Sequence, residues 1–573
     1  MKTEHSQNNE TPDSAYTRTL NWILSFITGD CQMSSRQKIM LIFSLIAGCL
    51  LALLAGWNYM HLATIGLGKR KIIMLVQVIL VEWFFISLIL FTVISNIHRA
   101  NRIFWQHFIS WSILYSIAYF FLSPGFLYID SYYWIPRGLE ECSRKPWLFG
   151  NIRHYMPYLH YQLFLIPHYN FFMVIQYSLV ASLIALTAQT IYNYSKSIIP
   201  IIVLNTILLI SIPFHVVVLA LVRETPYAIF TTFTAIFLFI LLSKPKDKIY
   251  SSPLLFLITI TTSVTTILHP QGILLAFIVA CIILFNAFQW QYDKFLKNGI
   301  MPCVCIISIT LASNFILGHK SQPWYKHVVP FQCVACYIYF HPELKDSNPN
   351  ETYAVMDYFF DLEKYQKNRI TPKGHLSPGF ASSCLRMNHT WNSPKNETIR
   401  FRRVMLRLIK DNPGIFIETR TRFAMNLYGI NRPIYFVSRN SQTGITIPDN
   451  NMYSNDIFIP CMKKFHIPEK SRYLPIIHNY IYPKQTKYFW ACIPHFLVLI
   501  MILLLNYYIP KSACVTLLYF GYSCVVFLMV PSESWLYVIC PFLGALFVLP
   551  LAIAEFYERY IILQNNRYGD ITS

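Results

Sequence analysis

Ionisable side chains that could carry out acid–base chemistry gather in residues 123–167, a polar segment rich in proline and aromatic residues between two long apolar stretches. The ionisable residues of interest are Asp130, Arg137, Glu140, Glu141, Arg153, His154 and His160. Such groups are costly beside a bilayer unless they face water or one another. We therefore predict that this segment is a loop between two membrane spans and the reaction centre, with Asp130 as its base.

A carboxylate base beside a membrane-embedded cavity suits the attack of a hydroxyl group on a lipid-linked donor. The departing phosphate of such a donor needs cations or hydrogen-bond donors around it. The candidates on the same face of the membrane are Arg137, Arg153, His154 and Arg223, with His160 and His269 as further donors or proton relays.

Each of these residues also has a plainer structural explanation. The alternatives are a helix cap for Asp130, loop solvation for Glu140 and Glu141, an ion pair at a tight turn for Arg223 and Glu224, and a helix end for His269 before Pro270. The aromatic residues of the loop could stack on sugar rings or anchor it at the membrane interface; they are Tyr132, Tyr133, Trp134 and Trp147.

The composition places the chain among polytopic membrane proteins. Of 573 residues, 55% are hydrophobic and only 13% are charged, whereas soluble proteins carry about 25% charged residues. The net charge of +20 is spread over short loops, which indicates membrane topology rather than binding to nucleic acid. The fourteen cysteines lie mostly in or beside apolar runs and predict no disulfide framework.

Apolar stretches predict twelve spans, at 39–57, 72–97, 103–122, 168–192, 198–222, 225–242, 252–268, 272–290, 298–316, 490–509, 512–530 and 534–556. The distribution of Lys and Arg favours cytoplasmic termini. The expected parts are a cytoplasmic tail (1–38), a bundle (39–316) with the catalytic loop 123–167, a mixed outer-face domain (317–489), and C-terminal helices with a short tail (490–573).

Within the outer-face region, 351–366 is predicted to be helical and 399–410 to be a basic amphipathic helix in the headgroup plane. Its apolar face would consist of Phe401, Val404, Met405 and Leu408. Asn412 before Pro413 predicts the start of a further helix. Cys333 and Cys336 have the spacing of half a zinc site, but this spacing also fits one face of a helix.

Five stretches of the chain carry a resemblance to a known group; they are PGFLYIDS, HYMPYLHYQL, LVRETPYAIF, TILHPQGILLAF and KDNPGIFIETRTRF. Together they resemble a group of bacterial membrane proteins that are similar to glycosyltransferases of the GT-C class. The resemblance implies an all-α membrane bundle and an inverting enzyme of the bacterial inner membrane. Such an enzyme takes a sugar from a polyprenyl-phosphate donor to a glycan or lipid acceptor and binds no nucleic acid. Some GT-C enzymes use a divalent cation, but no cofactor is certain here, because the chain shows no convincing ligand cluster.

By this resemblance Asp130 takes the position of the acidic residue that serves as base or positions the acceptor. Donor phosphate or substrate would be bound by Arg137, Arg153, His154, His160, Arg223, Glu224, His269 and Gln271. The chain departs from the pattern at Ser534–Tyr537, where an arginine is expected and none stands. One alternative function is a transporter or flippase for lipid-linked glycans. Such a protein needs ionisable residues in the middle of its spans, and Glu82 is the clear one. A further alternative is a non-catalytic assembly protein.

Overall fold

The protein is an all-α integral membrane protein over the residues that the structure describes. The computed structural model describes residues 102–122, 169–220, 224–243, 252–269, 271–287, 323–368, 384–386, 393–428, 492–529 and 535–569, with single positions within 42–49 and 300–308. In these ranges no strand forms, and Phe360 and Leu385 make an isolated β-bridge. In the domain that we expected to be mixed, the described residues therefore form helices joined by turns and loops, without a strand.

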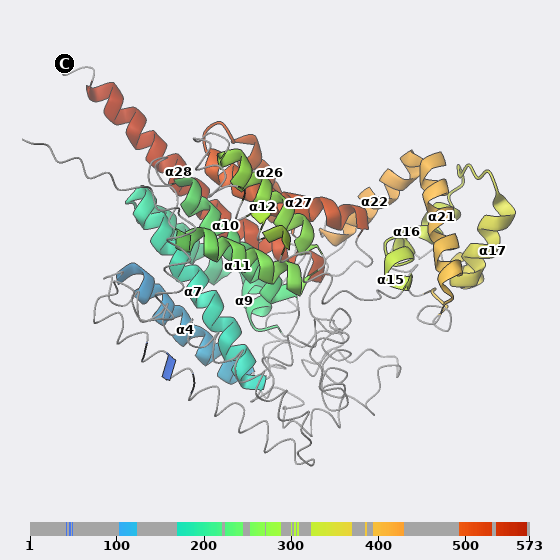
Figure 1. Cartoon of the computed structure of the whole chain (residues 1–573), viewed down its shortest axis with the longest axis horizontal. Coiled ribbons are helices and arrows are strands. Elements are labelled where there is room, and N and C mark those ends of the chain that lie inside the picture. Colours follow the sequence, from blue (N-terminus) through green and yellow to red (C-terminus); the bar gives the residue numbers. More distant parts are fainter. Residues whose placement is uncertain are drawn as a thin grey trace, which may run out of the picture.

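A bundle of long apolar helices forms the main body (Figure 1). Its elements are α4 (Arg102–Leu122), α7 (Tyr169–Ser195), α8 (Ile199–Ile210), α9 (Ile212–Val218), α10 (Glu224–Ser243), α11 (Ser252–Leu268), α12 (Gly272–Ala287), α26 (Ile493–Leu504), α27 (Pro510–Met529), the 3₁₀ turn η4 (Trp535–Val538) and α28 (Ile539–Gly569). The bounds of α11 coincide with one predicted span, and those of α4, α7, α10 and α27 lie within a few residues of others.

Not every predicted span is a single long helix. Among the described residues, four helices are long and apolar enough to cross a membrane, and a bent pair would raise this number to five. The pair is α8 and α9, which meet at 76° where the sequence predicted one continuous span, 198–222. The apolar helices α11, α12 and α26 are shorter. The predicted spans at 39–57, 72–97 and 298–316 lie wholly or largely outside the described residues.

Close approach of helices holds the centre of the bundle together. A Cβ atom on Gly544 of α28 would overlap the Tyr519 ring of α27, whose Cγ atom would lie 2.5 Å away, so glycine makes this close contact possible. The Tyr519 hydroxyl then donates to Thr232 Oγ1 of α10 at 3.2 Å. The three helices thus share one interface in which a small residue creates the space and a hydrogen bond sets the register.

The two ends of the bundle carry different polar groups. At the Lys511 end, the buried carboxylate of Glu555 in α28 accepts hydrogen bonds from the backbone N–H groups of Lys511 (3.0 Å) and Ser512 (2.8 Å). These N–H groups belong to the first turn of α27 and have no partner within that helix. The ammonium group of Lys511 also donates to the hydroxyl of Tyr194 in α7 at 2.7 Å.

Helix α28 is longer than the hydrocarbon core of a bilayer is thick. It has 31 residues and so measures about 46 Å, whereas that core measures about 30 Å. In Figure 1 the helix runs along the bundle and continues past it towards the C-terminus.

A second, smaller helical domain has its own core. It contains α15 (Pro323–His327), α16 (Gln332–Tyr339), α17 (Pro349–Phe359), α18 (Leu362–Asn368), α21 (Lys395–Asp411) and α22 (Pro413–Leu427). Asn412 precedes the start of α22, as predicted. The predicted helix over 351–366 is two helices, α17 and α18, interrupted at Phe360 and Asp361.

The apolar face of α21 is buried in the domain, so its predicted placement in the headgroup plane through that face is wrong. Phe401, Val404, Met405 and Leu408 are fully buried, and the Phe401 ring packs edge-on against Phe359 at 5.0 Å. The hydrophobic pattern was correct, but a protein core rather than lipid covers it.

The helix α22 connects this domain to the bundle (Figure 1). Phe423, Leu427 and Tyr428 at its end belong to the core of the bundle, and Tyr428 accepts a hydrogen bond from the Cys492 backbone N–H at 3.1 Å. Within α22 the buried Arg420 donates to the Pro330 carbonyl at 2.5 Å. Burial lowers the pKa of its guanidinium to about 10.

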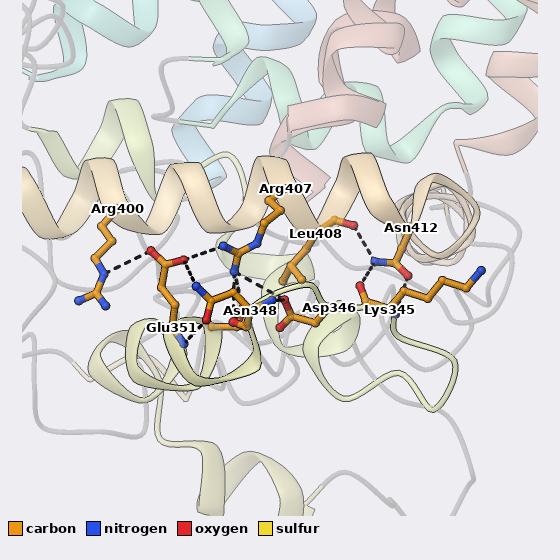
Figure 2. A network of polar contacts seen from close by, with 9 residues as sticks. Lys345, Asp346, Asn348, Glu351, Arg400, Arg407, Leu408 and Asn412 are labelled. Atoms are coloured by element: carbon orange, nitrogen blue, oxygen red, sulfur yellow. Dashed lines mark hydrogen bonds and ion pairs between the residues drawn. The ribbon is translucent and has the colours of Figure 1, made fainter.

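Arg407 of α21 is the centre of a polar network that ties α21 to the start of α17 (Figure 2). Its guanidinium donates to Glu351 Oε2 at 2.6 Å and to Thr352 Oγ1 at 2.8 Å, and it lies 3.6 Å from Asp346 Oδ1. Asn348 caps α17 by accepting from the Glu351 N–H. The hydrogen bond from Arg407 holds the pKa of Glu351 below its usual value.

We predict that Arg407→Gln destabilises the smaller domain by about 1.5–3 kcal/mol, the usual contribution of hydrogen bonds to charged groups. The matched control is Arg402→Gln on the exposed side of α21. Because the folded-state pKa of Glu351 is depressed, its contribution is present at neutral pH and is lost as the pH falls below about 4.

Hydrogen exchange of residues 349–359 measures this effect. The difference between wild type and Arg407→Gln should be present at pH about 7 and shrink in acid. Equal protection of wild type and Arg407→Gln at neutral pH would contradict the proposed role of the network.

Candidate functional site

Three of the predicted site residues lie together at one end of the bundle, which we call the Glu224 end. They are Glu224 at the start of α10, His269 after the end of α11 and Gln271 before the start of α12. His269 Nε2 lies 3.9 Å from Glu224 Oε1, and the two side chains are only 6% and 4% exposed. The remaining predicted residues, Asp130, Arg137, Arg153, His154, His160 and Arg223, lie outside the described residues.

The position of Glu224 follows from how the chain enters α10. The hydroxyl of Thr225 donates to the Val217 carbonyl of α9 at 3.1 Å. Gln176 of α7 donates to the carbonyls of Val218 (2.7 Å) and Ala220 (3.0 Å). These bonds hold the backbone at the end of α9 against α7 and against the start of α10. The carboxylate of Glu224 therefore sits in the first turn of a helix, where the helix dipole favours a negative charge.

A tight turn positions His269. Its backbone N–H donates to the Thr265 carbonyl at 3.1 Å, and its carbonyl accepts from the Gly272 N–H at 2.9 Å. A Cβ atom on Gly272 would lie 2.6 Å from Thr266 Cα and would also meet the Thr265 carbonyl oxygen. Both contacts are with backbone, so glycine is required for α12 to start this close to the end of α11.

Hydrogen bonding determines the tautomer of His269. The Gln271 backbone N–H donates to His269 Nδ1 at 3.3 Å. Because this nitrogen accepts, the proton of the neutral ring is on Nε2, the atom that faces the Glu224 carboxylate. The pair therefore presents an oriented N–H group next to a buried carboxylate, an arrangement that can orient a hydroxyl group or hold a proton.

Two tyrosines that sequence reasoning did not single out complete the cluster. The Tyr227 ring of α10 lies 5.1 Å from the His269 ring and 5.6 Å from that of Tyr522 in α27. Tyr227 follows Glu224 by three residues and so shares its face of α10; this spacing was the available signal. Tyr522 comes from the distant C-terminal part, and nothing in the sequence connected it with His269.

The side-chain oxygen of Gln271 is buried and has no hydrogen-bond partner among the described residues. A buried polar atom without a partner is uncommon in native structures and calls for an explanation such as a water or ligand. We refer to Glu224, Tyr227, His269, Gln271 and Tyr522 as the polar cluster.

Other parts of the chain reach the same end of the bundle. The end of α4 lies beside the start of α7, where the Tyr119 and Tyr177 rings are 6.3 Å apart. The chain therefore leaves for, and returns from, the segment containing Asp130 at the Glu224 end. The smaller domain joins the bundle through Tyr428 next to the start of α26, which packs against the start of α28 through His495 and Phe542.

The described part of the chain contains no group of three or more His, Cys, Asp or Glu side chains that could hold a metal ion. Cys333 and Cys336 lie on one helix, α16, and both are buried. Burial raises the pKa of the Cys336 thiol, which keeps it protonated and inert.

We predict that Gly272→Ala disrupts the polar cluster, because its methyl group would meet backbone atoms that cannot rotate away. Gly414→Ala in α22 is the matched control, since nothing lies within 4 Å of a Cβ atom at that position. Thermal unfolding in detergent should show a lower midpoint for Gly272→Ala and an unchanged or higher one for Gly414→Ala. Equal midpoints for wild type and Gly272→Ala would contradict the close approach of α11 and α12.

Comparison with known proteins provides no relative from which a function could be inferred. The chain matches no protein-family model, no curated protein and no solved structure.

Proposed function

We propose that the protein is a membrane glycosyltransferase that transfers a sugar from a polyprenyl-phosphate donor to a glycan or lipid acceptor. Its full bundle would have about twelve helices of GT-C type. One observation carries the proposal: the polar cluster at the Glu224 end, from which the chain also leaves for the segment that contains Asp130.

The chemistry of the polar cluster suits a ligand rich in hydroxyl groups. A carboxylate accepts hydrogen bonds, while an imidazole N–H and an amide NH₂ donate them. Tyrosine rings offer apolar faces to a sugar. The unpartnered oxygen of Gln271 supplies a further acceptor.

In the proposed reaction, Asp130 takes the proton of the acceptor hydroxyl as its oxygen attacks the anomeric carbon. A new C–O bond forms, the bond from the anomeric carbon to the phosphate oxygen breaks, and polyprenyl phosphate leaves with the electron pair. Attack from the opposite face inverts the anomeric centre. The cations Arg137, Arg153, His154 and Arg223 would stabilise the phosphate, and the polar cluster, with His160 nearby, would orient the sugar.

Glu224 is one of the residues expected to bind donor phosphate or substrate, and we assign it to the sugar. Its carboxylate, which faces His269 at 3.9 Å, would repel a phosphate but accepts hydrogen bonds from sugar hydroxyls. The proposed location is the bacterial inner membrane, with both termini in the cytoplasm and the Glu224 end on the outer face.

A second candidate function is transport of a lipid-linked glycan. The bent pair α8 and α9 favours it, because broken helices form substrate sites in many transporters. Export of labelled lipid-linked glycan from sealed vesicles, without transfer of its sugar, would support this candidate over the enzyme. A purely structural assembly protein would show neither activity.

We predict that Asp130→Asn lowers the transfer rate by about 10²–10⁴, the contribution of a general base, with normal folding and expression. Glu140→Gln and Glu141→Gln are matched controls in the same segment and should keep most of the activity. Arg223→Gln should weaken use of the donor through loss of a charge opposite the phosphate.

The assay uses purified protein in nanodiscs, a polyprenyl-phosphate sugar and equal amounts of folded wild type and variants. Wild-type transfer by Asp130→Asn would remove Asp130 as the base, and an essential Glu140 or Glu141 would move that role along the loop. Absence of transfer by wild type with any lipid-linked donor would count against the enzyme itself.

A further inference from the structure

A row of polar and aromatic side chains runs along α4 inside the bundle. His107, Trp111, Tyr115 and Tyr119 are spaced by four residues and so lie on one face of the helix. This face meets α7, α8 and α9 rather than lipid: Trp111, Tyr115 and Tyr119 are buried. His107 Nε2, Trp111 Nε1 and the Tyr115 hydroxyl have partners on helices far away in sequence.

Asn205 of α8 connects α4 to the broken helix pair. Its side-chain oxygen accepts from Trp111 Nε1 at 3.1 Å. Its NH₂ group donates to His107 Nε2 at 3.0 Å and to the Ile201 carbonyl at 3.0 Å. One acceptor and two donors of the amide are thus all engaged, and only this orientation of the amide fits these partners.

The partners of His107 determine its tautomer. His107 Nδ1 lies 2.9 Å from the Ile103 carbonyl, which can only accept, so Nδ1 carries the proton. The other nitrogen, Nε2, is therefore the acceptor for Asn205. Besides His107, the charged and titratable groups of α4 are Arg102, Tyr115 and Tyr119, and those with described side chains on α7, α8 and α9 are Tyr177, Tyr192, Tyr194 and His215.

His215 closes the break between α8 and α9. Pro213 has no N–H, so the Leu209 carbonyl four residues earlier cannot receive its usual helical hydrogen bond. His215 Nε2 lies 3.2 Å from that carbonyl and donates to it. Its other nitrogen, Nδ1, accepts from the Tyr115 hydroxyl at 3.4 Å, and the Trp111 ring stacks on the imidazole with centroids 6.3 Å apart.

We propose that His107, Asn205, Trp111 and His215 form a proton-operated latch that holds α4 against the bend of α8 and α9. The latch is closed while His107 is neutral. Protonation of His107 opens it and loosens the bend. This conformational role is independent of sugar transfer.

Hydrogen bonding explains why His107 is the sensitive group. Protonation puts an N–H on Nε2, which then faces the NH₂ group of Asn205. A flip of the Asn205 amide restores that one bond, but it turns the NH₂ group towards Trp111 N–H and the oxygen towards the Ile201 carbonyl. Two favourable contacts become unfavourable. Protonated His215 has no such conflict, since the Tyr115 hydroxyl can rotate and accept.

Hydrogen-exchange mass spectrometry of the full-length protein in nanodiscs tests the latch, with exchange times corrected for the intrinsic effect of pH. We compare pH about 8 with pH about 5.5, the range over which imidazole usually changes charge. In wild type, the backbone amides of residues 199–218 should exchange about tenfold faster at the lower pH, the size expected for one or two lost hydrogen bonds. Equal corrected exchange at both pH values in wild type overturns the proposal.

Two variants separate the latch from a general effect of acid. In His107→Gln, the side-chain oxygen accepts from Asn205 at every pH, so the pH dependence should disappear. In Asn205→Asp, the carboxylate accepts from both Trp111 and protonated His107, so the sign should reverse and protection should increase in acid. His495→Gln in α26 is the matched control and should respond as wild type does. A wild-type response in His107→Gln, or in Asn205→Asp, would overturn the assignment of His107 as the switch.

Discussion

Polar groups inside the bundle must find their partners within the protein, because the hydrocarbon core of a bilayer offers no water to replace them. Much of the described structure follows from this constraint. Glu555 accepts from two backbone N–H groups at the start of α27, and His215 donates to the carbonyl that Pro213 leaves without a partner. In both places a side chain from one segment satisfies a backbone group that helix geometry cannot satisfy.

The same constraint explains why the polar cluster lies where it does. Helix ends expose N–H and C=O groups, and several helices end or begin at the Glu224 end of the bundle. Their unsatisfied backbone groups draw in side chains such as Gln176, which serves two carbonyls at once. Glu224 and His269 at this end of the bundle are therefore attached to backbone that hydrogen bonds to neighbouring residues already hold in place. The bundle therefore provides a rigid frame, and the segments between helices supply the remaining chemistry.

Sequence reasoning was successful where one physical rule dominates. Apolar stretches of about twenty residues predicted most of the described membrane helices, and α11 even has the predicted bounds. It was less successful where two environments impose the same pattern. The apolar face of α21 fits a lipid surface and a protein core equally well, and only the three-dimensional structure shows that Phe359 covers Phe401.

Part of the site was also beyond the sequence. His269 and Gln271 could be predicted as candidate site residues because they stand at a turn between two spans. Tyr522 could not, because its neighbours in space are distant in sequence. The row on α4 was overlooked because average hydropathy hides a single polar face. The bend at Ser211 had a visible signal in Pro213, which disfavours helical geometry in the residue before it, yet the apolar run concealed it.

The length of α28 has a mechanical consequence. Its 31 residues rise about 46 Å, about 16 Å more than the thickness of the hydrocarbon core of a bilayer. Because a continuous helix cannot shorten to fit the bilayer, α28 has to tilt or to carry part of its length into the headgroup region.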